Sequence, residues 1–277
     1  MTFRDQASPH PSPYAMGYSK EFLGLLARRN AETVAVHLLP HLRPGMKVLD
    51  CGCGPGTISV GLAKAVAPGD LHGVDIEASQ IAMAQAAAQA GGHGNARFQV
   101  SDATNLPFAD NTFDVVHCHA VLMHVLNLDQ VLAEVKRVLK PDGLLSARES
   151  VLEAYVFEPD PQGLLKQTTD TFAKLLTTNG GHPHLGKALK SVLLEAGFRT
   201  VRATASFEPF SKEEDRIFLQ GFIRNWFFAP KMKDPTIQYG LATENDFAAW
   251  GEALDAWRAD PGGFAAFAWG EVIAHQA

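Results

Sequence analysis

Five short apolar segments recur between residues 46 and 150, and three of them finish on or beside an aspartate. They span residues 46–50, 70–77, 96–103, 111–118 and 144–148. Apolar residues between Leu128 and Leu139 recur at intervals of three and four, which predicts an amphipathic helix that ends before the turn at Lys140–Gly143. Strands that alternate with helices in this way predict a parallel sheet covered by helices on both faces.

The rest of the chain alternates less regularly. Residues 1–13 contain several prolines without periodicity and are expected to be flexible, whereas Tyr14 to Pro40 should be helical. Beyond the fifth strand the pattern predicts two helices followed by two strands, at residues 164–176, 185–196, 198–207 and 264–275.

Aromatic residues are concentrated between residues 211 and 260 at roughly helical spacing. We interpret this stretch as a helical insertion that caps the substrate pocket, and the same spacing also suits ordinary core packing or a subunit interface. The expected organisation is therefore a flexible segment of residues 1–13, a core formed by residues 14–210 together with 261–277, and the insertion of residues 211–260.

The loop after the first strand, Asp50-Cys-Gly-Cys-Gly-Pro-Gly56, has three glycines at alternate positions. Glycine lets the backbone adopt positive φ and approach a ligand closely, so this loop predicts a site for a nucleoside-sized molecule. The spacing differs from the G-x-G-x-x-G dinucleotide fingerprint, and the Gly-Lys-Ser/Thr ending of a phosphate-binding loop is missing. A carboxylate at Asp50 would repel a pyrophosphate but would pair with a ligand ammonium group.

Two further acids follow at the ends of the next strands. Asp75 comes about 20 residues after the glycine loop, where one carboxylate can accept hydrogen bonds from both ribose hydroxyls. Asp102 ends the third segment and is followed by Ala103 and by Leu-Pro-Phe. Because the carboxyl ends of parallel strands meet at one sheet edge, we expect these acids to share a site with the loop.

Five motifs of this chain resemble, in the same order, those of class I S-adenosylmethionine-dependent methyltransferases. They are Val-Leu-Asp-x-Gly-x-Gly-Pro-Gly, Gly-Val-Asp, Asp-Ala-x-x-Leu-Pro-Phe, Phe-Asp-Val-Val and Leu-Lys-Pro-Asp-Gly. Within that class they are similar to the ubiquinone and menaquinone biosynthesis C-methyltransferases. The resemblance implies an α/β fold with a doubly wound, seven-stranded, mostly parallel sheet, the Rossmann-like methyltransferase fold. It also implies N-terminal helices, a helical insertion before the last strand, and a seventh strand antiparallel beside the sixth at the sheet edge.

The resemblance further implies a small-molecule methyltransferase that uses S-adenosylmethionine and releases S-adenosylhomocysteine, acting on an apolar or aromatic metabolite. Carried over by motif, Asp75 would contact the ribose and Asp102 the adenine amine. The methionine portion would lie against Asp50, Gly52, Gly54 and Gly56. The other expected cofactor contacts are Arg29, which could pair with the cofactor carboxylate or be a solvated helix charge, and Cys53, Ile76, Gln80, Ala103, Cys118 and His119.

Methyl transfer from a sulfonium demands alignment and a dry site, so proximity could be the main catalytic device. A hydroxyl or carbon acceptor benefits from a general base, for which His124 beyond the fourth strand and Glu149 at the end of the fifth are candidates. Tyr14 could line the substrate side. Packing or hydrogen bonding is the ordinary alternative for each of these residues.

The net charge of −6, the pI near 6.0 and the lack of a dense Lys/Arg run disfavour nucleic acid and anionic membranes as partners. We see neither a secretory signal nor a membrane span and expect a soluble, cytoplasmic protein that could form a homodimer. The three cysteines suit a reducing compartment.

Three alternatives stay open. Cys51 and Cys53 could form a metal site with Cys118 or with nearby histidines at 117, 119 and 124, although Cys-x-Cys lacks the usual zinc spacing and we expect no metal. A nucleotide-dependent oxidoreductase would share the sheet but would have the longer glycine spacing. A non-catalytic or diverted member would bind the cofactor without transferring a methyl group.

Overall fold

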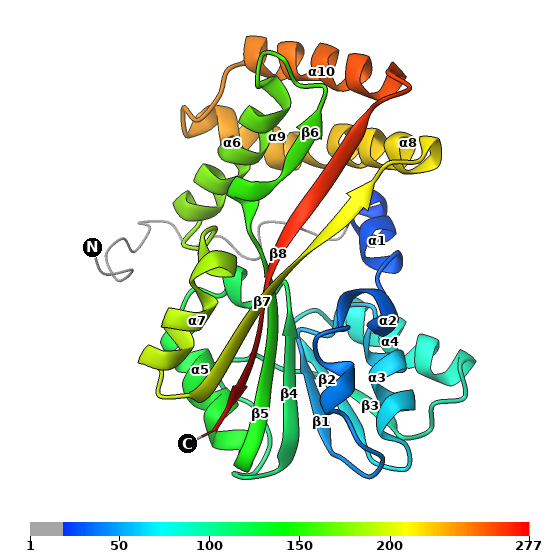
Figure 1. The fold of residues 1–277 in the computed structure, drawn as a ribbon, viewed down its shortest axis with the longest axis vertical. Helices are drawn as coiled ribbons and strands as arrows, with labels where there is room; N and C mark the ends of the chain where they lie inside the picture. Colours follow the sequence, from blue (N-terminus) through cyan, green and yellow to red (C-terminus); the bar gives the residue numbers. More distant parts are fainter. Residues whose placement is uncertain (1–18, 277) are drawn as a thin grey trace.

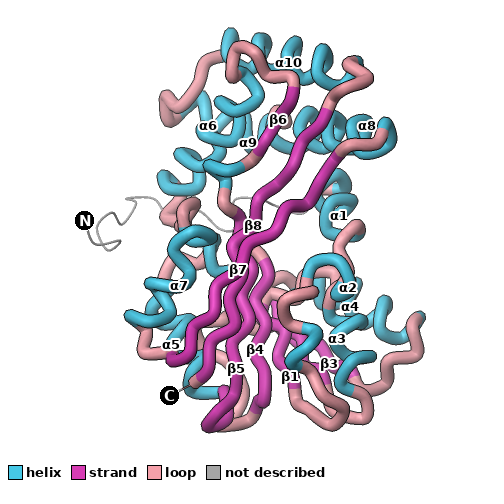
Figure 2. The backbone as a smooth tube through the Cα atoms, in the orientation of Figure 1, coloured by secondary structure: helices cyan, strands magenta, loops and turns pink. Residues whose placement is uncertain are grey.

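The computed structural model describes residues 19–276, which form an eight-stranded sheet with helices on both faces (Figures 1 and 2). The strand order is β3-β2-β1-β4-β5-β8, and β6 and β7 each pair with β8. The first five strands are parallel to one another, whereas β8 is antiparallel to its neighbours. The strands are β1 Val48–Cys51, β2 Leu71–Asp75, β3 Ala96–Val100, β4 Phe113–His119, β5 Leu139–Ser150, β6 Val156–Glu158, β7 Arg199–Phe210 and β8 Phe264–His275.

The doubly wound fold expected from the sequence is confirmed, with two differences at the antiparallel end. The last strand does not lie at the edge, because β8 pairs with β5 on one side and with β7 on the other. Burial explains this order: almost every residue of β8 is buried, whereas most residues of β7 are exposed, as suits an edge strand. The short strand β6 was not predicted, and it pairs with the first residues of β8.

Helices cover the two faces of the parallel sheet with separate apolar cores. One face packs against α2 Ala31–Val34, the 3₁₀ turn η1 Leu39–His41, α3 Ser59–Val66 and α4 Ala78–Ala90. The other face packs against α5 Leu128–Val138 and α7 Leu185–Glu195. Gly197 has φ +81° and lies just beyond the end of α7, as is common after a helix C-terminus.

A third apolar cluster lies beyond the carboxyl ends of the parallel strands, at the top of Figure 1. The outer parts of β7 and β8 extend into this helical layer, so the two antiparallel strands connect it to the sheet. The layer consists of α1 Lys20–Ala27, α6 Leu164–Thr178, α8 Glu213–Phe222, the π-helix η4 Ile223–Phe227, α9 Pro230–Gln238 and α10 Glu244–Ala259.

The N-terminal helical segment is interrupted within the described residues. Ser19 caps α1 by accepting a hydrogen bond from Phe22 N at 3.2 Å, and Asn30 caps α2 by accepting one from Thr33 N at 3.0 Å. A second cap so soon after the first starts a new helix, which places Arg28 and Arg29 in the junction. The predicted flexible residues 1–13, and Tyr14, lie outside the described residues.

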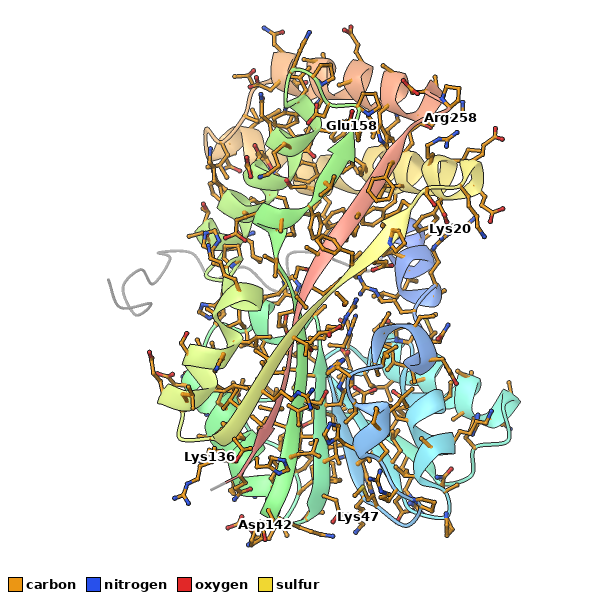
Figure 3. The ribbon with its side chains drawn as sticks, in the orientation of Figure 1. Lys20, Lys47, Lys136, Asp142, Glu158 and Arg258 are labelled. Carbon is orange, nitrogen blue, oxygen red and sulfur yellow. The ribbon has the colours of Figure 1, made fainter. Side chains whose placement is uncertain are left out.

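Figure 3 labels charged residues at both ends of the molecule. Figure 3 places Lys47 and Asp142 at the end of the sheet away from the helical layer, and Glu158 and Arg258 on the outside of that layer. Within residues 19–276, no helix is both long and apolar enough to cross a membrane.

Candidate functional site

The glycine loop joins β1 to α3 and is shaped by contacts that exclude side chains. Gly52, Gly54 and Gly56 all have positive φ, at 77°, 52° and 79°. A Cβ on Gly52 would lie 2.2 Å from a methyl carbon of Val121, so the loop after β4 approaches too closely for any side chain. A Cβ on Gly54 would meet nothing nearer than 3.9 Å, which leaves room for a ligand against the backbone at this point.

Asp75, at the end of β2, orders this loop. Its carboxylate accepts hydrogen bonds from Gly54 N at 2.9 Å and from Glu77 N at 3.0 Å. Burial raises the pKa of Asp75, and the two backbone donors oppose that rise. The remaining lone pairs can accept hydroxyl donors from a ligand.

Asp50 lies near the end of β1 and Asp102 two residues after β3, the two strands that flank β2. Asp50 is buried, and Ser59 donates a hydrogen bond to its carboxylate at 2.5 Å; burial raises the pKa of Asp50 to about 6. Asp102 is exposed, and one of its carboxylate oxygens accepts hydrogen bonds from Thr104 N and Thr104 Oγ1, both at 2.8 Å. All three aspartates line one cavity of about 500 Å³.

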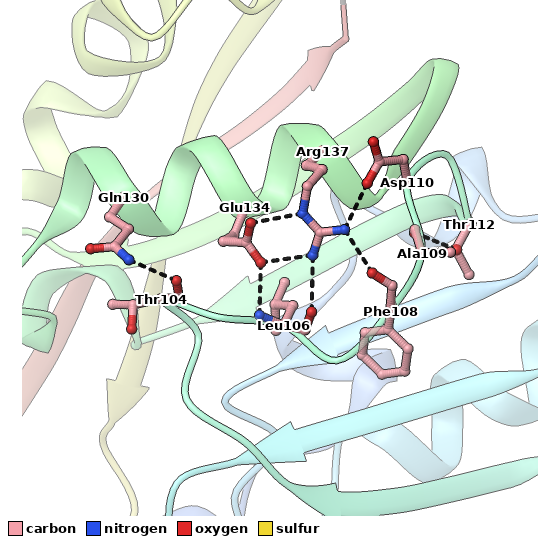
Figure 4. Close-up of polar contacts among 9 residues, drawn as sticks. All are labelled: Thr104, Leu106, Phe108, Ala109, Asp110, Thr112, Gln130, Glu134 and Arg137. Atoms are coloured by element: carbon pink, nitrogen blue, oxygen red, sulfur yellow. Dashed lines mark hydrogen bonds and ion pairs between the residues drawn. The ribbon is translucent and has the colours of Figure 1, made fainter.

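The segment after Asp102 is held by helix α5 (Figure 4). Arg137 donates to the carbonyl oxygens of Phe108 at 2.6 Å and Leu106 at 2.9 Å, while Glu134 accepts a hydrogen bond from Leu106 N at 2.8 Å. Gln130 donates to the carbonyl oxygen of Thr104 at 3.0 Å. These contacts fix the backbone that follows Asp102 and Ala103 at the cavity.

The other half of the cavity is apolar and aromatic. It lies between the carboxyl ends of β4 and β5 and the helical layer, and the π-helix η4 contributes three of its lining side chains. Trp226 stacks against Phe222 with ring centroids 4.9 Å apart and against Phe22 at 5.8 Å. The apolar lining residues are Phe22, Leu25, Leu152, Tyr155, Phe157, Phe172, Leu176, Phe222, Ile223, Trp226, Phe227, Phe267 and Trp269.

Helix α1 links the two halves of the cavity. Thr57 in the glycine loop donates a hydrogen bond to Leu26 O at 3.1 Å, and Arg28 forms an ion pair with Asp215 of α8. The next residue, Arg29, is only 7% exposed and lines the cavity with its guanidinium 5.0 Å from the ring centre of Trp269. Arg29 is thus a buried cation at the cavity, and the solvated helix charge considered from sequence is excluded.

Three residues predicted as a cofactor contact or a general base, His119, His124 and Glu149, surround the loop that follows β4. His119 and His124 line the cavity. Burial and the nearby Arg29 lower the pKa of His124 to about 4 and that of His119 well below its usual value, so both are neutral at pH 7. His119 stacks on Trp269 with ring centroids 5.1 Å apart.

Glu149 does not line the cavity. It is fully buried, and its carboxylate accepts hydrogen bonds from Val121 N at 3.0 Å, Leu122 N at 2.8 Å and Met123 N at 3.3 Å. These donors belong to the loop that supplies Val121, Met123 and His124 to the cavity. Burial raises the pKa of Glu149 from 4.5 to about 7.

Because the folded pKa of Glu149 exceeds the unfolded value, the folded protein holds an extra proton between pH 4.5 and 7. As the pH rises from 4.5 to 7, the free energy of unfolding should therefore fall by about 3 kcal/mol through Glu149 alone. We expect Glu149→Gln to remove this part of the pH dependence, measured by urea unfolding of both proteins at pH 4.5 and 7. The opposite contribution of His37, whose pKa is lowered to about 4, is common to both proteins and cancels in the difference. Parallel pH dependences in the two proteins would contradict the assignment.

The cavity brings together most of the residues expected from sequence. Those that line it are Arg29, Asp50, Gly52, Cys53, Gly54, Asp75, Ile76, Asp102, Ala103, His119 and His124. Gly56, Gln80 and Cys118 do not. A Cβ on Gly56 would lie 2.7 Å from Ala84 of α4, so this glycine serves helix packing, while Gln80 is buried behind Gly54. Cys118 is buried beside its register partner Cys51. In the described part of the chain, no cluster of three or more His, Cys, Asp or Glu could hold a metal ion.

Some cavity residues come from distant segments and were not predicted from the sequence. Tyr155 follows β5, Phe172 lies on α6, and Trp269 lies on β8. The only signal for Trp269 was its place in a buried, almost wholly apolar strand, and Tyr155 and Phe172 carried no local signal.

Comparison with known proteins agrees with this geometry. The family model described as a methyltransferase domain matches residues 42–197. An uncharacterized methyltransferase of Schizosaccharomyces pombe is 32% identical over 213 residues, which are 73% of this chain and 75% of that protein. A ubiquinone/menaquinone biosynthesis C-methyltransferase of Shewanella piezotolerans is 31% identical over 176 residues, 58% of this chain and 70% of that protein.

Among solved structures, the YcgJ protein of Bacillus subtilis has the same fold, with a TM-score of 0.58 and 20% identity over 92% of this chain and 97% of that one. This chain belongs to the class I S-adenosylmethionine-dependent methyltransferases and methylates a small molecule.

Proposed function

We propose that the methyl acceptor is an apolar, uncharged small molecule that binds in the aromatic half of the cavity. The observation that carries this proposal is the division of one cavity into two halves. All of its carboxylates lie at the strand ends near the glycine loop, and the walls around Trp226 and Phe172 are aromatic. A cationic acceptor would find no acid in that half, whereas apolar surface there gains from burial.

The polar half fits the cofactor. Asp75 has free lone pairs for the ribose hydroxyls. Gly54 leaves a space beside its backbone for the cofactor, which a Cβ at this position would fill. Asp102, which lines the cavity and is exposed, would accept a hydrogen bond from the adenine amine, and Ile76 and Ala103 would offer apolar contacts to the ring. Asp50 and Arg29 supply opposite charges for the amino and carboxylate groups of the methionine portion.

S-adenosylmethionine supplies a methyl group on a sulfonium. The chain itself would enclose the acceptor within apolar walls that exclude water, and transfer requires the acceptor to lie in line with that group. His124 is neutral and lines the cavity, but a pKa of about 4 makes it a weak base, so we assign it a contact to the acceptor instead of proton removal. We assign Glu149 a positioning role, because it fixes the backbone before His124 through three hydrogen bonds.

Incubation of the purified protein with S-adenosylmethionine and a panel of phenols, quinols and other apolar ring compounds tests this function. We expect S-adenosylhomocysteine to form with at least one class of acceptor. Tight cofactor binding without product from any apolar acceptor would instead support a diverted member of the fold. The homodimer and the cytoplasmic location stay predictions.

Phe172→Ala should weaken binding of the apolar probe 2-methylnaphthalene by about 10-fold, because one aromatic wall of the cavity is lost. Phe172 contacts Trp226 edge-to-face with ring centroids 5.4 Å apart. Affinity for S-adenosylhomocysteine should not change, since Phe172 lies in the acceptor half. Equilibrium dialysis measures the probe, and Phe207→Ala serves as the control because Phe207 is 60% exposed on the edge strand. Equal losses in both variants would argue against the assignment.

A further inference from the structure

A pair of hydroxyl groups lies in the wall of the apolar half of the cavity. Tyr155 Oη donates a hydrogen bond to Ser150 Oγ at 3.1 Å, and both residues line the cavity. Ser150 is the last residue of β5, and Tyr155 follows the short 3₁₀ turn Leu152–Ala154. The strand order β1-β4-β5 places Ser150 two strands from β1, which is about 10 Å across the sheet, on the acceptor side.

Both hydroxyls keep hydrogen-bonding capacity for a ligand. Across residues 19–276, their mutual contact is the one hydrogen bond that either side-chain oxygen makes. The proton of Ser150 Oγ is therefore available to donate, and the lone pairs of Tyr155 Oη are available to accept. The other hydroxyls lining this half differ, because Thr168 and Thr169 donate to carbonyl oxygens of their own helix at 2.6 and 2.8 Å.

The pair is held rigidly. The ring of Tyr155 stacks on Phe267 with centroids 4.2 Å apart and an interplanar angle of 10°. Ser150 is buried and is paired through its backbone with Trp269 of β8. Burial raises the pKa of Tyr155 to about 12, so the phenol keeps its proton. A fixed, neutral donor and acceptor among aromatic walls can impose strong selectivity, since an unmatched polar group there costs free energy.

We infer that Ser150 and Tyr155 form a specificity subsite for one hydroxyl or carbonyl oxygen on an otherwise apolar methyl acceptor. This inference rests on the proposed acceptor half of the cavity and adds the polar group that the acceptor must carry. A carbonyl oxygen would accept the Ser150 proton, and a hydroxyl would in addition donate to Tyr155. An acceptor without oxygen would leave the Ser150 donor buried and unpaired.

Two probes of similar shape test the subsite, 2-naphthol and 2-methylnaphthalene, each bound in the presence of S-adenosylhomocysteine. The measured quantity is the ratio of the Kd of 2-methylnaphthalene to that of 2-naphthol, obtained by equilibrium dialysis. We expect Tyr155→Phe and Ser150→Ala each to lower this ratio by about 3- to 10-fold relative to the unchanged protein. Tyr239→Phe is the matched control, because Tyr239 lies on the surface after α9 and outside the cavity.

The outcomes separate the two proposals. A lowered ratio in both cavity variants, with S-adenosylhomocysteine affinity unchanged, supports the subsite. An unchanged ratio in both variants, with both probes bound, overturns the subsite and leaves the apolar acceptor half standing. Failure of both probes to bind the unchanged protein overturns the apolar acceptor half and the subsite with it. Thermal melting of each variant establishes that the comparison is made on folded protein.

Discussion

Asp75→Ala should lower the affinity for S-adenosylmethionine by at least about 100-fold. Two ribose hydroxyls would lose charge-assisted hydrogen bonds worth about 1.5–3 kcal/mol each, and a loss of about 3 kcal/mol is already more than 100-fold. The variant also loses the acceptor of Gly54 N, which lies 2.9 Å from the carboxylate, so the glycine loop is less ordered before the ligand arrives. Isothermal titration with S-adenosylmethionine and S-adenosylhomocysteine measures the loss.

Asp70→Ala is the control for this prediction, because Asp70 precedes the opposite end of β2 and forms an ion pair with Arg97. Its removal should leave cofactor affinity within about 2-fold, as expected for an exposed ion pair. Asp75→Asn should fall between the two, since an amide keeps one acceptor oxygen. Cofactor affinity that survives Asp75→Ala in a folded protein would show that the ribose lies elsewhere.

Gly270→Ala should destabilise the protein by about 3 kcal/mol or more, because the new methyl group has no space. A Cβ on Gly270 of β8 would lie 1.9 Å from the carbonyl oxygen of Gly186 on α7, and that oxygen belongs to backbone that cannot rotate away. Helix α7 would have to lift from the sheet, which would also disturb the ends of β5. Urea unfolding measures the loss.

Gly221→Ala is the matched control, since nothing lies within 4 Å of a Cβ at this position in helix α8. The same substitution there should stabilise the protein by about 0.5–1 kcal/mol through the better helix propensity of alanine. Unfolding midpoints that shift equally in both variants would contradict the close contact between α7 and β8.

The parallel half of the fold could be predicted from sequence because its signals are local. Each of β1, β2 and β3 is a short apolar run that ends at or just before an aspartate, and the rule that ligands bind at the carboxyl ends of parallel strands brings those aspartates together. Gly52 and Gly54 carried the loop geometry in their spacing. The glycines and aspartates of the polar half of the cavity could therefore be predicted from about 100 consecutive residues.

The acceptor half could not be predicted in the same way, because its walls come from segments far apart in the chain. Trp269 meets His119 across the sheet, and Phe22 meets Trp226 in the helical layer. Aromatic residues at helical spacing can pack in a core or line a cavity, and the sequence does not distinguish the two. Arg29 was ambiguous for a related reason: its burial depends on Asn30 starting a new helix, which turns the junction toward the cavity.

The position of β8 within the sheet also orders the assembly of the protein as it is made. Residues 48–150 include β1 to β5, so the cofactor half can form while the nascent chain is incomplete. The edge of β5 that β8 will occupy stays open until residues 264–275 are synthesised, and an open strand edge invites pairing with other chains. Because Phe267 and Trp269 also line the cavity, we expect its aromatic wall to be complete only in chains whose synthesis has passed β8.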